Sequence, residues 1–139
     1  MNHNPELSLR LGLADTKILL VGGDPRHEVA ARIQSGLNLA AIIHCPTRKS
    51  DASCWRFASA LKANCYSLVI CARGLTRTQH GSDLHEFCRQ FDLPLLNCTR
   101  LPHPNIIIPA IVHARLTSPV LRRCEELKRS ARRLRGGEG

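Results

Sequence analysis

The chain has 139 residues, only five of them aromatic, and a formal net charge of +9 at pH 7. This length suits one domain with an aliphatic core. The sequence shows neither a signal peptide nor an apolar run of roughly 20 residues, so we expect no membrane span and no membrane partner. Seven cysteines, an odd number without a Cys-x-x-Cys pair, are typical of the reducing cytoplasm.

The first 16 residues are predicted to form a separate N-terminal segment. Leu7, Leu9, Leu11 and Leu13 alternate strictly with other residues. Alternation with a period of two favours an edge strand, or an arm that packs on a partner. We therefore expect residues 1–16 to be an arm or an edge strand.

The next segment opens with a strand, a tight turn and a helix. The strand expected at about residues 17–22 contains four aliphatic residues, 18–21, which stop at Gly22, Gly23 and Asp24. This pattern predicts a buried parallel strand followed by a turn, and apolar residues at helical spacing predict a helix over 26–37. Backbone N–H groups at such a junction favour anions, so a phosphate fits there.

Strands and helices continue to alternate as far as residue 113. Short aliphatic runs predict strands at 39–44, 67–72 and 93–98. Two helices are expected between them, beginning at Asp51 or Ser53 and at Ser82 or Asp83. The polar loop 73–81 is unusually long for such a unit, and long loops in this position are often functional.

The run from Ile106 to Val112 is the least regular part of this pattern. Its aliphatic residues favour a fifth strand, but Pro109 lies in the middle, which confines the strand to an edge or starts a helix. Strands that alternate with helices imply a parallel sheet covered on both faces. We expect residues 17–113 to form one three-layer α/β domain, Rossmann-like or flavodoxin-like, with four or five parallel strands.

Residues 114–139 are expected to be a basic helix and tail. They carry eight basic and three acidic side chains, which supplies +5 of the net charge. Pro119 suits the first turn of a helix that runs to about Arg135. The apolar stripe of this helix comprises Val120, Leu121, Cys124, Leu127, Ala131 and Leu134. The cations around the stripe are Arg122, Arg123, Lys128, Arg129, Arg132, Arg133 and Arg135.

The density of cations on this helix suggests contact with nucleic acid, an anionic surface or an acidic protein. Several arginines could contact phosphates and position the protein without reading sequence. One alternative is a solvated helix that keeps the protein soluble. Another is a helix whose apolar stripe packs on a partner subunit.

A second candidate site lies where the parallel strands end. Ligands of such sheets bind outside the carboxyl ends of the strands, where the strand order reverses. The expected ligand-binding residues are Gly22, Gly23, Asp24, Arg26, His44, Arg73 and His80. Their arginines and histidines suit an anionic ligand such as a nucleotide. A Gly-x-Gly-x-x-Gly fingerprint is absent, so the alternative is an ordinary turn with Asp24 as the helix cap.

The sequence lacks the residues that several common types of active site and binding site require. A phosphate-accepting receiver domain needs an Asp at the end of the third strand, where this chain has Cys71 and Ala72. A P-loop needs Gly-Lys-Ser or Gly-Lys-Thr, and neither occurs. His85 and Cys88 are three residues apart, but the paired spacings of zinc sites are absent, and no signature marks a cysteine nucleophile. We therefore assign no catalytic residue, no metal ligand and no cofactor.

Residues 17–24, Lys-Ile-Leu-Leu-Val-Gly-Gly-Asp, resemble the opening of a small bacterial family known only as a domain of unknown function. The resemblance continues at residues 67–70, at His80 and at 92–94, and covers about residues 17–98. It implies a Rossmann-like fold and a bacterial or mobile-element source. It implies no activity.

Together these patterns predict a non-enzymatic, Rossmann-like accessory or regulatory protein of the cytoplasm. Its basic helix is expected to bind nucleic acid or a nucleoprotein partner, and its strand ends an anionic small molecule. The first alternative is an enzyme or sensor that acts on a nucleotide. The second is a structural subunit whose N-terminal leucines and C-terminal stripe are buried in a homo- or hetero-oligomer.

Overall fold

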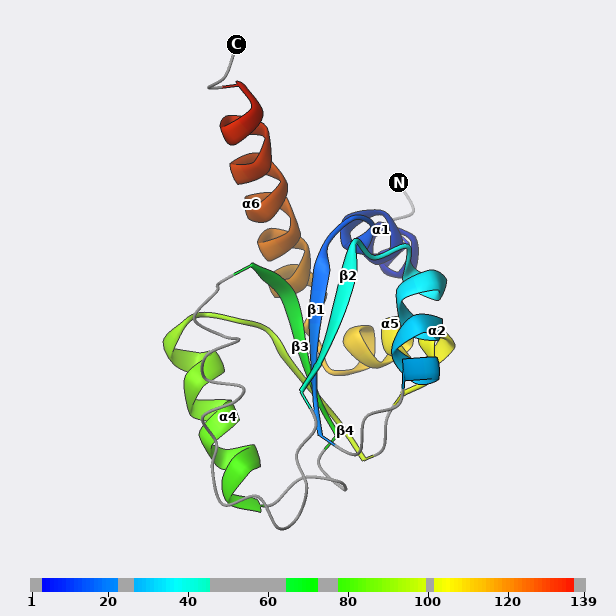
Figure 1. Ribbon diagram of the computed structural model, residues 1–139, viewed down its shortest axis with the longest axis vertical. Coiled ribbons are helices and arrows are strands. Elements are labelled where there is room, and N and C mark those ends of the chain that lie inside the picture. Colours follow the sequence, from blue (N-terminus) through cyan, green and yellow to red (C-terminus); the bar gives the residue numbers. More distant parts are fainter. Residues whose placement is uncertain (1–3, 23–26, 46–64, 73–77, 100–101, 137–139) are drawn as a thin grey trace.

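The chain folds around a sheet of parallel strands (Figure 1). The structure, a computed structural model, describes residues 4–22, 27–45, 65–72, 78–99 and 102–136. The strands are β1 (Lys17–Val21), β2 (Ala41–Cys45), β3 (Tyr66–Ala72) and β4 (Leu95–Cys98), in the order β2-β1-β3-β4. The predicted α/β class is confirmed, with four strands in a flavodoxin/Rossmann-like arrangement.

The two central strands, β1 and β3, carry the core of the sheet. Leu19 of β1 pairs with Ile43 of β2 on one side and with Val69 of β3 on the other, and β4 pairs with the far side of β3. Every residue of β3 and all of β1 after Lys17 are buried. Burial on both faces explains why these strands are continuous aliphatic runs in the sequence.

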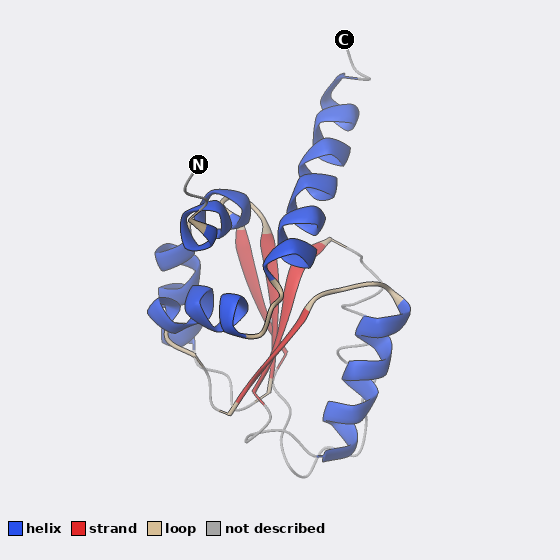
Figure 2. Ribbon diagram, turned by 180° about the vertical axis from the view of Figure 1, so that it is seen from behind, coloured by secondary structure: helices blue, strands red, loops and turns tan. Residues whose placement is uncertain are grey.

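Alternate residues of β1 face two separate cores, and helices cover both. The described helices are α1 (Pro5–Leu13), α2 (His27–Leu37), α4 (Thr78–Gln90), α5 (Pro104–His113) and α6 (Thr117–Gly136). Ile18 and Leu20 pack with residues of α1, α2, α5 and α6, whereas Leu19 and Val21 pack with residues of α4. Figure 2 shows α4 on one side of the sheet and α1, α2 and α5 on the other.

The N-terminal segment is helical, so the edge strand predicted within residues 1–16 is wrong. Asn4 caps α1, because its Oδ1 accepts hydrogen bonds from the backbone N–H groups of Glu6 (3.1 Å) and Leu7 (3.3 Å). Pro5 occupies the first turn, where its missing N–H costs nothing. A polar cap followed by proline therefore starts a helix here.

The alternating leucines are compatible with this helix because they form two pairs, and the two leucines of each pair are four residues apart. Leu9 and Leu13 are fully buried, whereas Leu7 and Leu11 are 54% and 67% exposed. Residues four apart share a helical face, so the period-two pattern divides into one buried face and one exposed face. The exposed pair forms an apolar surface that a strand would not have produced.

The run 106–112 is also helical, and no fifth strand forms there. His103 caps α5, since its Nδ1 accepts a hydrogen bond from the backbone N–H of Asn105 at 3.1 Å, and Pro104 occupies the first turn. Pro109 lies inside the helix at an exposed position. The buried isoleucines of α5 recur at helical spacing, which explains how this apolar run packs as a helix.

The other helices confirm the predictions with shifted ends. α4 begins at Thr78, four residues before the expected cap at Ser82, so the second half of the predicted loop 73–81 is helical. α6 begins at Thr117 and ends at Gly136, close to the predicted bounds. The helix expected between the second and third strands lies outside the described residues.

Two buried hydroxyl groups join α1 to the sheet. Thr16 Oγ1 and Ser67 Oγ lie 3.0 Å apart, Thr16 Oγ1 is 2.6 Å from the carbonyl of Leu13, and Ser67 Oγ is 3.1 Å from the carbonyl of Lys17. Each hydroxyl has one proton, so two of these three contacts are filled at a time. Burial raises the pKa of the nearby Cys124 thiol of α6 overall, although both hydroxyls lower it. The cluster ties α1, β1, β3 and α6 together.

Candidate functional site

The strand order reverses between β1 and β3. The chain moves from β1 to β2 on one side and then crosses to β3 on the other side of β1. The carboxyl ends of both strands lie together, because Val21 pairs with Cys71. In open α/β sheets this is the position where ligands bind.

The structure brings two of the predicted ligand residues into contact at this edge. His44 Nε2 lies 2.7 Å from the carbonyl oxygen of Gly22. Because a carbonyl can only accept, Nε2 carries the hydrogen and donates it. Gly22 has a φ of 119°, a conformation that favours glycine. His44 therefore holds the turn after β1 in place, and this contact occupies one of its ring nitrogens.

The remaining predicted residues of this edge are placed only in part. His80 belongs to the first turns of α4, and its side chain lies outside the described part of the chain. Outside the described residues lie Gly23, Asp24, Arg26 and Arg73. The structure thus places Gly22 and His44 together at the carboxyl end of the sheet. The grouping of all seven residues and their role in binding a ligand stay predictions.

Three cysteines near the sheet are poorly suited to nucleophilic chemistry. Burial raises the pKa of the Cys88 thiol to about 12, and the neighbouring Cys71 adds to the shift. The pKa of Cys98 is raised by burial and then by Cys71. Burial also raises the pKa of Cys124, although Lys128 opposes the shift. These thiols stay protonated at neutral pH, and the thiolate is the nucleophilic form.

The described residues contain no group of three or more His, Cys, Asp and Glu side chains arranged for a metal ion. His85 and Cys88, which are three apart on α4, differ in environment: His85 is exposed, whereas Cys88 is 2% exposed. Two side chains that bind one metal ion must face the same space, and the different exposure of His85 and Cys88 does not favour such a pair.

Charge is divided unevenly along α6. The packed half, residues 117–127, contains two arginines and two glutamates. The projecting half, residues 128–136, contains five cations and no acid. Figure 1 shows that this C-terminal half extends beyond the other elements of the fold. The cationic half of the helix is therefore the half that stands away from the body.

Burial along the apolar stripe shows the same division. Val120 and Cys124 are buried, and Leu127 is half-buried. Ala131, seven residues after Cys124 and on the same face, is exposed. Among the described residues of the stripe, only those of the packed half therefore contribute to the core.

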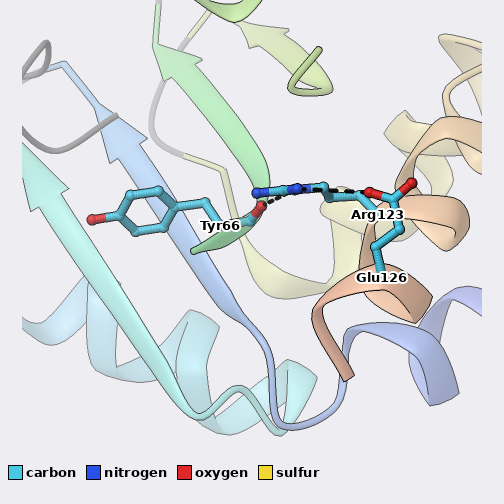
Figure 3. Close-up of polar contacts among 3 residues, drawn as sticks. All are labelled: Tyr66, Arg123 and Glu126. Atoms are coloured by element: carbon cyan, nitrogen blue, oxygen red, sulfur yellow. Dashed lines mark hydrogen bonds and ion pairs between the residues drawn. The ribbon is translucent and has the colours of Figure 1, made fainter. Parts of the chain in front are cut away.

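Arg123, one of the predicted phosphate contacts, has a structural role (Figure 3). Its Nε donates a hydrogen bond to the carbonyl of Tyr66 at 3.0 Å, and its Nη1 lies 3.7 Å from Glu126 Oε2. The Arg123 side chain is only 13% exposed. It fastens the packed half of α6 to the first residue of β3, and this burial takes it out of any surface for nucleic acid.

The other predicted cations differ in what they contact. Lys128 Nζ donates to the carbonyl of Leu11 at 3.1 Å. Arg129 pairs with Glu125 at 3.0 Å, one turn away, and both side chains are largely exposed. Arg122 and Arg132 are exposed as well. The side chains of Arg133 and Arg135 lie outside the described part, although their backbone belongs to α6.

Comparisons with known proteins add no family. No protein-family model, no curated protein and no solved structure matches the chain. The resemblance to the uncharacterised bacterial family, and the bacterial or mobile-element source that it implies, therefore stay predictions. Among the helices of the described part, none combines the length and the apolar character that a membrane crossing requires.

Proposed function

We propose that this protein is a non-enzymatic accessory or regulatory protein that binds nucleic acid through the projecting half of α6. The observation that carries the proposal is that the positive charge of α6 is concentrated in the part of the helix that projects from the fold. Five cations without an acid occupy the part of the helix that leaves the body of the fold. Phosphate backbones attract such a surface independently of sequence.

The competing explanation is that these cations stabilise the helix itself. Basic residues near a helix C-terminus interact favourably with the helix dipole, by about 0.3–1 kcal/mol each. That effect is confined to the last turn, whereas Lys128 and Arg129 lie two turns before Gly136. The helix dipole therefore accounts for Arg133 and Arg135 better than for the whole group.

Fluorescence anisotropy with labelled duplex DNA, duplex RNA and single-stranded DNA at increasing salt tests the proposal. Affinity should fall as salt rises. A plot of the logarithm of the binding constant against the logarithm of the salt concentration should have a slope no steeper than about −4.5 for five phosphate contacts on B-DNA. The variant R132A/R133A/R135A should bind much more weakly and show a slope reduced by about 2.7.

The matched control is R10A/R32A/R89A, which removes the same charge from exposed positions on α1, α2 and α4. This control should bind almost as tightly as the natural chain. Equal losses in the two triple variants would mean that only net charge matters, and binding that does not respond to salt would contradict the proposal.

A second candidate function is supported by the edge where β1 and β3 end. The left-handed turn at Gly22 and the His44 contact lie where open α/β sheets bind ligands, so a nucleotide is the candidate ligand. Thermal unfolding with a panel of nucleotides tests it. A ligand present at a hundred times its dissociation constant should add about 2.7 kcal/mol of stability. An unchanged melting temperature across the panel would contradict this second function.

A further inference from the structure

An apolar and a cationic surface meet where α6 leaves α1. Leu7 and Leu11 are 54% and 67% exposed, and lie four residues apart on one face of α1. Lys128 reaches across from α6, and its Nζ donates to the carbonyl of Leu11 at 3.1 Å. Leu11 and the first cation of the projecting half are therefore neighbours, and Leu7 lies one turn before Leu11 on the same face of α1.

A groove of about 310 Å³ lies between the two helices at this place. Its lining includes three apolar residues, Gly12, Leu121 and Cys124. It also includes two cations, Lys128 and Arg132. A Cβ atom on Gly12 would lie only 2.7 Å from Cδ2 of Leu121, so the two helices approach closely beside the groove. The groove and the exposed leucines together form the α1–α6 surface.

The charges of the α1–α6 surface select the kind of partner. Glu125 also lines the groove, but it pairs with Arg129 at 3.0 Å, so Lys128 and Arg132 leave the groove net positive. A second copy of the chain would bring the same five cations against these side chains. Nucleic acid would match the cations and leave the two leucines exposed to water.

We propose that the α1–α6 surface binds an acidic amphipathic helix of a partner protein. Apolar side chains of that helix cover Leu7 and Leu11, and its carboxylates lie against Lys128 and Arg132. Helices that bind in this way present anchors three, four and seven residues apart. The proposal does not rest on nucleic-acid binding, because Leu7 and Leu11 have no role in holding phosphate.

The test uses the full chain and two synthetic peptides of about 18 residues. One peptide places leucines on one helical face and glutamates on the other. The second has the same composition in an order without a helical face. Anisotropy of the labelled peptides should show binding of the amphipathic peptide and at least about tenfold weaker binding of its scrambled counterpart.

The variant L7S/L11S should weaken binding of the amphipathic peptide at least about tenfold, because buried apolar anchors supply most of the affinity of such contacts. The matched control is Ile106→Ser, which changes a 57% exposed side chain on α5. That control should leave peptide binding unchanged. Binding of labelled duplex DNA should be the same in both variants and in the natural chain.

Three kinds of result would overturn the proposal. The first is equal binding of the two peptides, or peptide binding that survives L7S/L11S. The second is loss of DNA binding in L7S/L11S, which would assign the surface to nucleic acid. The third is self-association of the natural chain by light scattering that L7S/L11S abolishes, which would assign the surface to a second copy. Failure of DNA binding alone would contradict the proposed function and leave this inference standing.

Discussion

The two halves of α6 carry the same apolar stripe in different surroundings. In the packed half, the stripe is core: Val120 is fully buried and Cys124 is 1% exposed. In the projecting half, Ala131 continues the stripe and is exposed. Charge follows the same boundary, balanced before Lys128 and entirely positive after it. One helix therefore combines an anchor with an extension whose surface is available to a partner.

This difference matters because the two halves should respond differently to the same change. The packed half is held by burial and by directed contacts such as Arg123 with Tyr66. The projecting half has few such contacts among the described residues, so its cations add little to folding. Stability measurements can therefore separate the residues that fold the protein from those that would bind a partner.

The largest expected effect comes from placing the same acid in each half. Val120→Asp buries an unpaired charge, so we expect a loss of about 3–5 kcal/mol in the free energy of unfolding, a large share of the roughly 5–15 kcal/mol that stabilises a typical domain. Ala131→Asp puts the carboxylate in water beside arginines, and should change stability by less than about 1 kcal/mol. Urea denaturation followed by circular dichroism measures both. Similar losses in the two variants would mean that the projecting half also packs.

Alkaline pH should weaken the packed regions and leave the four arginine charges of the projecting half intact. The pKa of Cys88 rises from 9.0 to about 12 on burial, so the folded protein holds this proton more tightly than the unfolded chain. Its contribution is complete below about pH 9 and is lost as the pH rises towards 12, by at most about 1.4 kcal/mol for each pH unit. Arginines stay protonated throughout this range.

Urea denaturation at several pH values between about 8 and 11 measures this loss. Cys88→Ala should be less stable at pH 8, because it leaves a small cavity, but its stability should fall less steeply with pH. Equal slopes for Cys88→Ala and the natural chain would mean that the Cys88 thiol is not protected in the folded state.

A smaller effect separates two adjacent arginines of the packed half. Arg123→Ala removes the hydrogen bond to the carbonyl of Tyr66 and the ion pair with Glu126, so we expect a loss of about 1–2 kcal/mol. Arg122→Ala changes an exposed side chain and should cost less than about 0.5 kcal/mol. Thermal unfolding of the two variants makes the comparison. Equal melting temperatures would show that the Arg123 contacts do not hold α6.

The strands were predictable because burial on both faces leaves a direct mark on the sequence. The aliphatic runs that end at Gly22 and at Ala72 are both parallel strands of the sheet, and Gly22 adopts the left-handed conformation that a tight turn requires. The strands and the turn are determined largely by residues that are close together in the chain. Sequence patterns describe such local relations well.

Apolar periodicity alone did not predict α1, and for the run that forms α5 it left a strand and a helix start both open. Asn4-Pro5 and His103-Pro104 both place a polar acceptor before a proline, and both start helices. Alternating leucines after the first and an aliphatic run after the second favour strands by pattern alone. The caps decide between the two structures.

The sequence could not predict which cations of α6 make structural contacts and which are exposed. Arg123 and Arg122 are adjacent and identical, yet only Arg123 reaches the carbonyl of Tyr66, 57 residues earlier in the chain. A contact over that distance depends on how α6 docks against β3. The sequence identified a basic helix, and only the fold separates its anchoring arginine from its exposed ones.

The contact between Lys128 and Leu11 joins residues that are 117 positions apart in the chain. A ribosome makes the leucines of α1 long before it makes the helix that packs beside them. Until α6 emerges, α1 lacks one of its packing partners, and contacts between such distant segments form slowly. The nascent chain therefore passes through a stage in which the leucine-rich N-terminus is more exposed than in the native fold.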